Sequence, residues 1–262
     1  FDKLRGAGQY LVPTNSDSEG ASSNIQLSFN MTGVTLGVGS NVNNSGSTYA
    51  QWNFRRAPGF FDEVCYTGTG VAGLAVTHNL GVVPELMIIK TRTPYSSSWI
   101  VYTAPTGNAG ALYLSSADAL ETAGGPGYFN NTTPTATQFT VGNYTSTNAG
   151  SLVAYLFATL AGISKVGSYT GTGAAQTINC GFTTGARFVL IKRTDATGGW
   201  HVWDSARGII PSNDPYLLIN SIAAEVTGTD YVDTTNVGFD ITSTAPAALN
   251  ANGGNYIFLA IA

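Results

Sequence analysis

A repeat of about one hundred residues constrains the fold of this chain more than any other feature of its sequence. The pentapeptide Tyr-Thr-Gly-Thr-Gly occupies residues 66–70 and again residues 169–173. Each copy precedes an apolar run that ends in lysine, at residues 86–90 and then at residues 188–192. Because self-similarity at a fixed period indicates copies of one structural unit, we predict tandem copies of a single domain.

The N-terminus resembles the second half of the same unit. Residues 1–6 read Phe-Asp-Lys-Leu-Arg-Gly, and residues 203–208 read Trp-Asp-Ser-Ala-Arg-Gly. A glutamate also recurs after equivalent apolar runs, as Glu19, Glu121 and Glu225. We therefore expect the sequence to be a fragment of a longer polypeptide, or its earlier part to be cleaved or disordered.

The composition favours β-structure. Charged residues make up 10% of the chain, against about 25% in a typical globular protein. Threonine suits strands, glycine and asparagine suit turns, and glycine and β-branched residues reduce helix propensity. We predict an all-β chain of tandem β-sandwich, jelly-roll-like domains of about 100 residues. Residues 59–160 and 161–262 are the complete domains, and residues 1–58 are the second half of a domain.

Each complete copy contains six to eight short strands, separated by turns rich in glycine and asparagine. The continuous apolar runs at residues 86–89 and 188–191 predict central strands that are buried on both faces. Residues 115–121 and 221–225 are the only segments for which we expect helix, a single turn in each.

The junctions between copies, at residues 54–61 and 156–162, contain no linker rich in proline and serine. Adjacent copies should therefore pack closely rather than move as beads on a string. Phe60 and Phe61 are candidates for a plug between domains, although a role as ordinary strand residues is equally consistent with their positions.

Charge and cysteine content exclude several classes of protein. The net charge is −4, and basic residues occur singly or in adjacent pairs such as Arg55–Arg56 with no larger cluster, so we predict no nucleic-acid partner. No run of eighteen apolar residues exists, so we predict no membrane insertion. Cys65 and Cys180 are far apart in sequence; two separate thiols are the favoured interpretation and one disulfide is the alternative.

The residues that usually carry catalysis are sparse. His78 and His201 are the two histidines, and neither accompanies a Gly-x-Ser-x-Gly nucleophile motif. No His, Cys and Asp cluster has metal-ligand spacing. We therefore predict no cofactor and no bound metal, with a structural or solvated role for each histidine.

Paired carboxylates would indicate a glycan hydrolase. Asp62 and Glu63 are adjacent on a presumed strand and should face opposite ways, and Asp214 with Glu225 is the other pair. The recurrent glutamates are more typical of local hydrogen-bond acceptors. We predict that the protein is not an enzyme.

Aromatic side chains are the best candidates for binding. A sugar-stacking or interface platform would consist of Trp99, Trp200, Trp203, Tyr102 and Tyr216. Their recurrence at equivalent repeat positions favours the alternative, in which they belong to the domain cores.

Several motifs together resemble a repeat domain of uncharacterised function found in tail-fibre-like and other virion proteins of tailed bacteriophages. The first full copy departs from the pattern, because Tyr102-Thr103-Ala104-Pro105 replaces the aromatic-Asp-x-x-Arg-Gly element. The resemblance covers nearly the whole chain and rests on residues 1–6, 33–37, 43–49, 52–54, 57–62, 66–70, 78–81 with Pro84 and Lys90, and 203–208.

The resemblance implies a virion protein, an extracellular particle component. We expect a structural tail fibre or fibre-like appendage that contributes to assembly and to attachment to a host-surface glycan. A capsid decoration protein and a tail-associated glycan hydrolase are the alternatives. The expected partners are other copies of itself, with a trimer as the fibre analogy, and other virion proteins.

Overall fold

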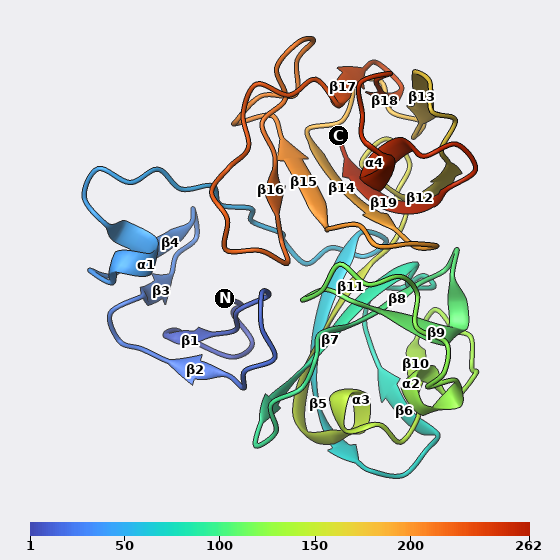
Figure 1. Ribbon diagram of the computed structural model, residues 1–262. Coiled ribbons are helices and arrows are strands. Elements are labelled where there is room, and N and C mark those ends of the chain that lie inside the picture. The colour runs from blue at the N-terminus through green and yellow to red at the C-terminus, as the bar shows by residue number, and fades with distance from the viewer.

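The structure, a computed structural model, describes all 262 residues (Figure 1). It consists of short antiparallel strands and four helices of one turn each. None of these helices has the length and apolarity needed to cross a membrane. The coarse prediction of an all-β chain is therefore confirmed, while tandem jelly-roll-like sandwiches remain a prediction.

The N-terminal segment, residues 1–57, contains two hairpins and one helical turn. Its elements are β1 (Gln9–Tyr10), β2 (Gly20–Ala21), β3 (Gln26–Phe29), β4 (Val34–Leu36) and α1 (Ser40–Asn43).

The middle unit follows with a five-stranded sheet and a two-stranded sheet. Its elements are β5 (Phe61–Thr69), β6 (Leu74–Thr77), β7 (Leu86–Thr93), β8 (Ile100–Thr103), β9 (Gly107–Tyr113), α2 (Pro126–Phe129), β10 (Gln138–Val141), α3 (Thr145–Asn148) and β11 (Ala149–Phe157).

The C-terminal unit has a five-stranded sheet and a three-stranded sheet. Its elements are β12 (Ser164–Thr170), β13 (Gln176–Asn179), β14 (Phe188–Arg193), β15 (His201–Asp204), β16 (Leu217–Leu218), β17 (Val232–Thr235), β18 (Gly238–Ile241), α4 (Ala247–Asn250) and β19 (Asn255–Ile261).

The two large sheets have the same strand order. The middle unit runs β5-β11-β7-β8-β9, and the C-terminal unit runs β12-β19-β14-β15-β16. Every neighbouring pair in both sheets is antiparallel. In each unit the last long strand, β11 or β19, lies between the first strand and the strand that contains the lysine of the apolar run, β7 or β14. It is therefore hydrogen-bonded along both edges.

Each unit encloses a core between its large and its small sheet. In the middle unit, Ile89 of β7 and Leu152 of β11 share a cluster with Phe139 of β10, and all three are fully buried. In the C-terminal unit, Val189 of β14 shares a cluster with Phe239 of β18. The apolar runs that end in lysine are therefore central strands, as their sequence predicts.

The predicted helical turns at residues 115–121 and 221–225 are wrong. Neither segment contains helix; the first ends in the bridge Ala111↔Glu121, and the second is followed by the bridge Tyr216↔Val226. Tertiary contacts override local preference in the first of them: Leu120 N–H donates to the carbonyl of Thr194 in the next unit at 2.8 Å. A backbone amide committed to that partner cannot bond within a helical turn.

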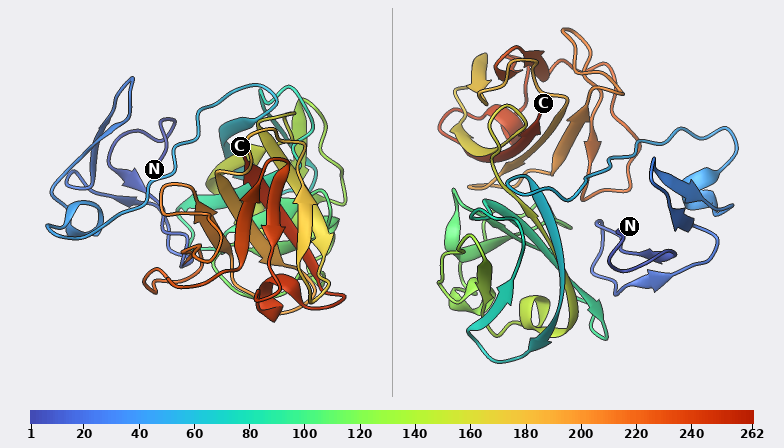
Figure 2. Two further views of the ribbon diagram at one scale, coloured as in Figure 1. Left: turned by 90° about the horizontal axis from the view of Figure 1, so that it is seen from above. Right: turned by 180° about the vertical axis from the view of Figure 1, so that it is seen from behind.

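A third cluster joins the parts of the molecule. It contains Phe61 and Trp99 of the middle unit together with Trp200 and Leu259 of the C-terminal unit, and Leu11 of the N-terminal segment packs against it. Figures 1 and 2 show the three parts side by side around this region. Close packing at the junctions is thus confirmed, and Phe61, 5% exposed, takes part in it.

A buried asparagine precedes the last strand of each unit. Asn148 accepts a hydrogen bond from Thr69 N–H at 2.8 Å and donates to the Val71 carbonyl at 2.8 Å. Asn250 does the same with Thr172 N–H and the Ala174 carbonyl, at 2.9 and 2.8 Å. These amides tie the turn after the first strand to the start of the last strand.

We expect Asn148→Ala to destabilise the chain by ~2–4 kcal/mol, because it leaves several buried backbone groups without partners. Urea unfolding measures the change in free energy. Asn108→Ala, at a half-buried asparagine on β9 whose amide donates to the Thr133 hydroxyl at 3.3 Å, is the control and should stay within ~0.5 kcal/mol of the wild type. Equal effects of the two substitutions would contradict the role of Asn148.

Candidate functional site

The strongest candidate for a functional surface is the seam at which one unit receives the hairpin of the unit before it. Between the middle and C-terminal units, Lys192 Nζ donates to the carbonyls of Ala117 and Asp118, at 3.3 and 2.7 Å. The indole N–H of Trp200 donates to the Tyr113 carbonyl at 2.9 Å. Lys192 and Trp200 are both fully buried.

The same seam occurs between the N-terminal segment and the middle unit. Lys90 Nζ donates to the carbonyl of Ser16 at 3.1 Å, and Trp99 Nε1–H donates to the carbonyl of Val12 at 3.0 Å. Lys90 is 0% exposed and Trp99 is 6% exposed. Residues recurring at the same repeat positions therefore make the same kind of contact twice.

Backbone hydrogen bonds reinforce both seams. Ser97 N–H donates to the Ser16 carbonyl at 2.8 Å, and Gly198 N–H donates to the Ala117 carbonyl at 2.9 Å. The carbonyl oxygens gathered there compensate the burial of an ammonium group, which would otherwise be costly. Burial still lowers the pKa of Lys192 to about 8, and that of Lys90 equally to about 8.

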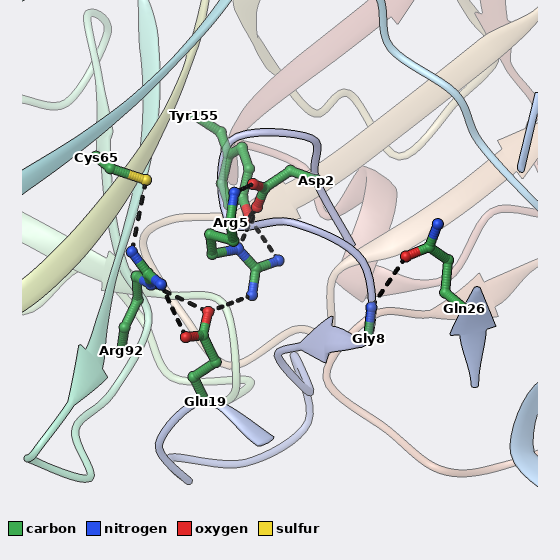
Figure 3. Close-up of polar contacts among 8 residues, drawn as sticks. All are labelled: Asp2, Arg5, Gly8, Glu19, Gln26, Cys65, Arg92 and Tyr155. Atoms are coloured by element: carbon green, nitrogen blue, oxygen red, sulfur yellow. Dashed lines mark hydrogen bonds and ion pairs between the residues drawn. The ribbon is translucent and has the colours of Figure 1, made fainter. Parts of the chain in front are cut away.

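An ion-pair cluster fixes the N-terminal segment to the middle unit (Figure 3). Arg5 pairs with Asp2 and, at 2.9 Å, with Glu19, and its side chain is fully buried. Glu19 also receives two bonds from Arg92 on β7, at 3.0 and 2.9 Å. Tyr155 on β11 donates to Asp2 at 2.7 Å. The five side chains satisfy one another across the contact.

Opposite effects set the pKa of the two acids in this cluster. Burial alone would raise the pKa of Asp2, but the charge of Arg5 and the hydrogen bonds from Tyr155 and Arg5 hold it below the ordinary value. Burial would likewise raise the pKa of Glu19, but the hydrogen bonds and charges of Arg92 and Arg5 lower it below the ordinary value. Both acids are therefore ionised structural partners at neutral pH.

The C-terminal unit repeats part of this cluster. Arg207 pairs with Asp204 at 2.7 Å and with Glu225 at 3.1 Å. Trp52 of the N-terminal segment donates its indole N–H to Asp204 at 3.0 Å, and Arg207 lies over the Trp52 ring. The Asp-x-x-Arg element thus faces a neighbouring part of the molecule in both places.

The middle unit lacks this element, and its glutamate takes other partners. Glu121 accepts hydrogen bonds from the Tyr128 hydroxyl and from Gly124 N–H. Tyr113 and Tyr128 share a hydroxyl contact of 2.6 Å, and the ring of Tyr144 meets that of Tyr128 edge to face at 4.8 Å. Burial and the neighbouring Glu121 raise the pKa of Tyr128.

These tyrosines line an open depression of about 420 Å³ beside Glu121. Aromatic rings next to a carboxylate can stack on a sugar and accept bonds from its hydroxyls. Sequence reasoning missed this feature. Only the replacement of the Asp-x-x-Arg-Gly element in this copy signalled that Glu121 would have different partners.

The sequence-predicted aromatic candidates lie elsewhere, with Tyr102 3% exposed and the three tryptophans at 6% or less. No sugar can stack on a ring whose faces are covered, so these residues do not form an exposed platform in this structure. Trp203 belongs to the C-terminal core and donates to the Asp214 carbonyl at 3.2 Å, and half-buried Tyr216 packs beside it at 5.8 Å between ring centroids. Trp99 and Trp200 make interface contacts within the chain, as described for the seams.

The histidines and cysteines have structural surroundings. His201 is 6% exposed on β15, a strand that is buried on both faces, so of the two expected roles the structure supports the structural one. His78 is equally buried and contacts the Thr135 carbonyl at 3.2 Å. Cys65 and Cys180 are free thiols, as the favoured interpretation of the sequence held.

Three of the four candidate acids, Asp62, Asp214 and Glu225, are engaged in backbone or ion-pair contacts. Asp62 pairs with Arg56 at 2.6 Å and accepts a bond from Asn79 N–H at 2.7 Å. Asp214 accepts bonds from the amides of Tyr231 and Val232. No group of three His, Cys, Asp or Glu side chains is arranged to hold a metal ion.

We expect Lys192→Met to lower the free energy of unfolding by ~1–3 kcal/mol, because the buried carbonyls of Ala117 and Asp118 lose their donor. Hydrogen exchange should also quicken in residues 112–121. Lys165→Met, on the less buried strand β12, is the matched control and should change neither quantity. Unaltered exchange in residues 112–121 of the Lys192 variant would contradict the seam.

The buried imidazole of His201 predicts a dependence of stability on pH. Burial lowers its pKa from 6.5 to about 4 in the folded chain. Between these values the unfolded chain binds the proton and the folded chain does not, so acidification favours unfolding. The contribution is fully present above pH 6.5 and is lost as pH falls through about 4, by at most ~3 kcal/mol.

The comparison of wild type with His201→Gln isolates this effect. Burial raises the pKa of Asp214 to about 6, which acts in the opposite direction, so the two titrations partly cancel in the wild type. Stability measured from pH 7 to pH 4 should fall more steeply in the wild type than in the variant. Parallel curves would show that His201 is not buried in its neutral form.

The family of the chain follows from a comparison of the whole sequence. A family model described as a domain of unknown function, DUF7483, matches residues 1–262, so the chain belongs to that family. No curated protein and no solved structure matches it.

Proposed function

We propose that this member of the DUF7483 family is a non-enzymatic structural protein of a tailed-bacteriophage particle. Its role would be that of a tail fibre or fibre-like appendage built from tandem β-sandwich units. The observation that carries the proposal is the recurrent seam, in which Lys90 with Trp99 and Lys192 with Trp200 hold the preceding hairpin. A chain that repeats one contact between successive units is suited to forming an extended, rigid body.

The surroundings of the recurrent glutamates favour a structural role over a catalytic one. Glu19 is held by two arginines, Glu225 by Arg207, and Glu121 by Tyr128 and a backbone amide. A glycan hydrolase would instead need two carboxylates facing one cleft, roughly 5–10 Å apart. The virion setting itself rests on the resemblance of residues 1–6, 57–62 and 203–208 to phage repeat domains.

Detection in purified particles tests the proposal. Mass spectrometry of gradient-purified virions should find the protein at a few copies per tail if it is a fibre. A copy number close to that of the capsid protein would favour the alternative, a capsid decoration protein. Its absence from particles, with abundance in the infected-cell lysate, would remove the virion assignment.

Attachment to a host-surface glycan is the second part of the proposal. The depression beside Glu121 supports it, because Tyr144 is 39% exposed and stands at its edge. Stacking on an aromatic ring contributes on the order of 1 kcal/mol beyond the area that it buries. We infer that a neutral or amino sugar would be held there.

We expect Tyr144→Ala to weaken binding to purified host envelope glycan about fivefold to tenfold, as the loss of one ring contact implies. Tyr95→Ala is the matched control, since Tyr95 is 46% exposed but lies outside the depression. Biolayer interferometry measures both. Equal affinity of wild type and both variants would place adhesion elsewhere or remove it.

A further inference from the structure

The N-terminal segment keeps the local geometry of the second half of the C-terminal unit. Tyr49 donates its hydroxyl to the Ser40 carbonyl and accepts from Asn44 N–H, at 3.0 and 2.8 Å. Tyr256 makes the same pair of bonds with the Ala247 carbonyl and Ala251 N–H, each at 2.7 Å.

The two hairpins also share one matching pair, although the β3–β4 pair has a register shift between Gln26 and Ser28 that the β17–β18 pair lacks. Leu36 lies opposite Gln26 in the β3–β4 pair, and Ile241 lies opposite Val232 in the β17–β18 pair. Residues 1–57 are therefore folded as half of a unit, with its turns and its hairpin in place.

The inner face of this half is uncovered. In the C-terminal unit, Ile241 and Tyr256 are 0% and 1% exposed, because β13 and β14 share their core cluster. At the matching positions, Leu36 is 37% exposed and Tyr49 is 50% exposed. Phe1, in the place of fully buried Trp203, is 49% exposed.

These side chains line one hollow of about 320 Å³, together with Phe29, Val34, Val42 and Trp52. Gln26 lines the same hollow and is 1% exposed, and its Nε2 group has no hydrogen-bond partner. A buried amide donor without a partner is costly. The hollow thus combines an apolar lining with one unpaired donor.

The unpaired backbone of residues 48–54 indicates which kind of segment would fill the hollow. Strand β19 pairs with β12 on one edge and β14 on the other. Its counterpart, residues 48–54, is in no sheet and forms no backbone–backbone hydrogen bond. Asn43, at the position of Asn250, keeps only its bond to a neighbouring carbonyl, that of Gly37 at 2.8 Å. Asn250 also binds the turn between β12 and β13.

We propose that the hollow is the docking surface for a complementing half-unit, a set of strands of the same type as β12 to β15. Two such strands would pair with both edges of residues 48–54, and a third would cover the apolar lining as β13 does. Phe1 occupies the position of Trp203, which lies within β15 in the C-terminal unit.

Fusion of residues 161–202 ahead of Phe1 tests this docking directly, because it rebuilds a complete unit in register. The docked strands should slow amide exchange in residues 48–54 at least tenfold and reduce the binding of a hydrophobic dye. The control fusion carries Ile178→Asp and Ile191→Asp in the added copy, at positions that are core in the C-terminal unit. It should leave exchange and dye binding as they are in the unfused chain.

A substitution on the docking face provides a second readout that does not depend on exchange rates. Leu36→Ser should leave the melting temperature of the unfused chain within about 1 °C but lower that of the fusion by several degrees, as expected for a newly buried leucine. Equal effects in both proteins, or unchanged exchange in residues 48–54 of the fusion, would overturn the proposal. So would a dimer of the unfused chain by light scattering that Leu36→Ser dissociates, because a second copy would then be the occupant.

Discussion

The architecture depends on a buried lysine–tryptophan contact that joins each unit to the one before it. Lys192 and Trp200 reach backbone carbonyls of the middle unit, and Lys90 and Trp99 reach those of the N-terminal segment. Backbone carbonyls exist at every position of a hairpin, so the contact places few demands on the sequence that it receives. Because only backbone carbonyls are needed, the sequences of the receiving hairpins can differ while the donating lysine and tryptophan recur.

The hydrophobic cluster shared by the three parts reinforces the seam contacts and holds the parts in a fixed arrangement. Aromatic and aliphatic side chains from all three parts meet there, and the ion pairs of Arg5 and Arg92 close its edge. A desolvated charge is favourable only with well-placed partners, which Figure 3 shows for this cluster. In the middle unit the equivalent glutamate has lost its arginine, and three tyrosines surround it instead.

The recurrence of short motifs predicted much of this organisation from sequence. The lysine-ending runs are the central strands, and the aromatic landmarks are buried in the unit cores or at the contacts between units, because burial leaves little freedom at such positions. The helical turn expected at residues 115–121 was wrong because the Leu120 amide bonds to Thr194 of the next unit, and residues 221–225 form no helix either. The depression beside Glu121 could not be predicted, since Tyr128 in α2 and Tyr144 at the start of α3 have no counterpart among the repeat landmarks.

Calorimetry tests most directly whether the seams unite the parts into one cooperative body. The ratio of the calorimetric to the van't Hoff enthalpy of unfolding counts the cooperative units in a chain. A ratio near one, with a single transition for the middle and C-terminal units, is the predicted result. Two resolved transitions of similar enthalpy would contradict the account, because each unit would then melt without regard to its neighbour.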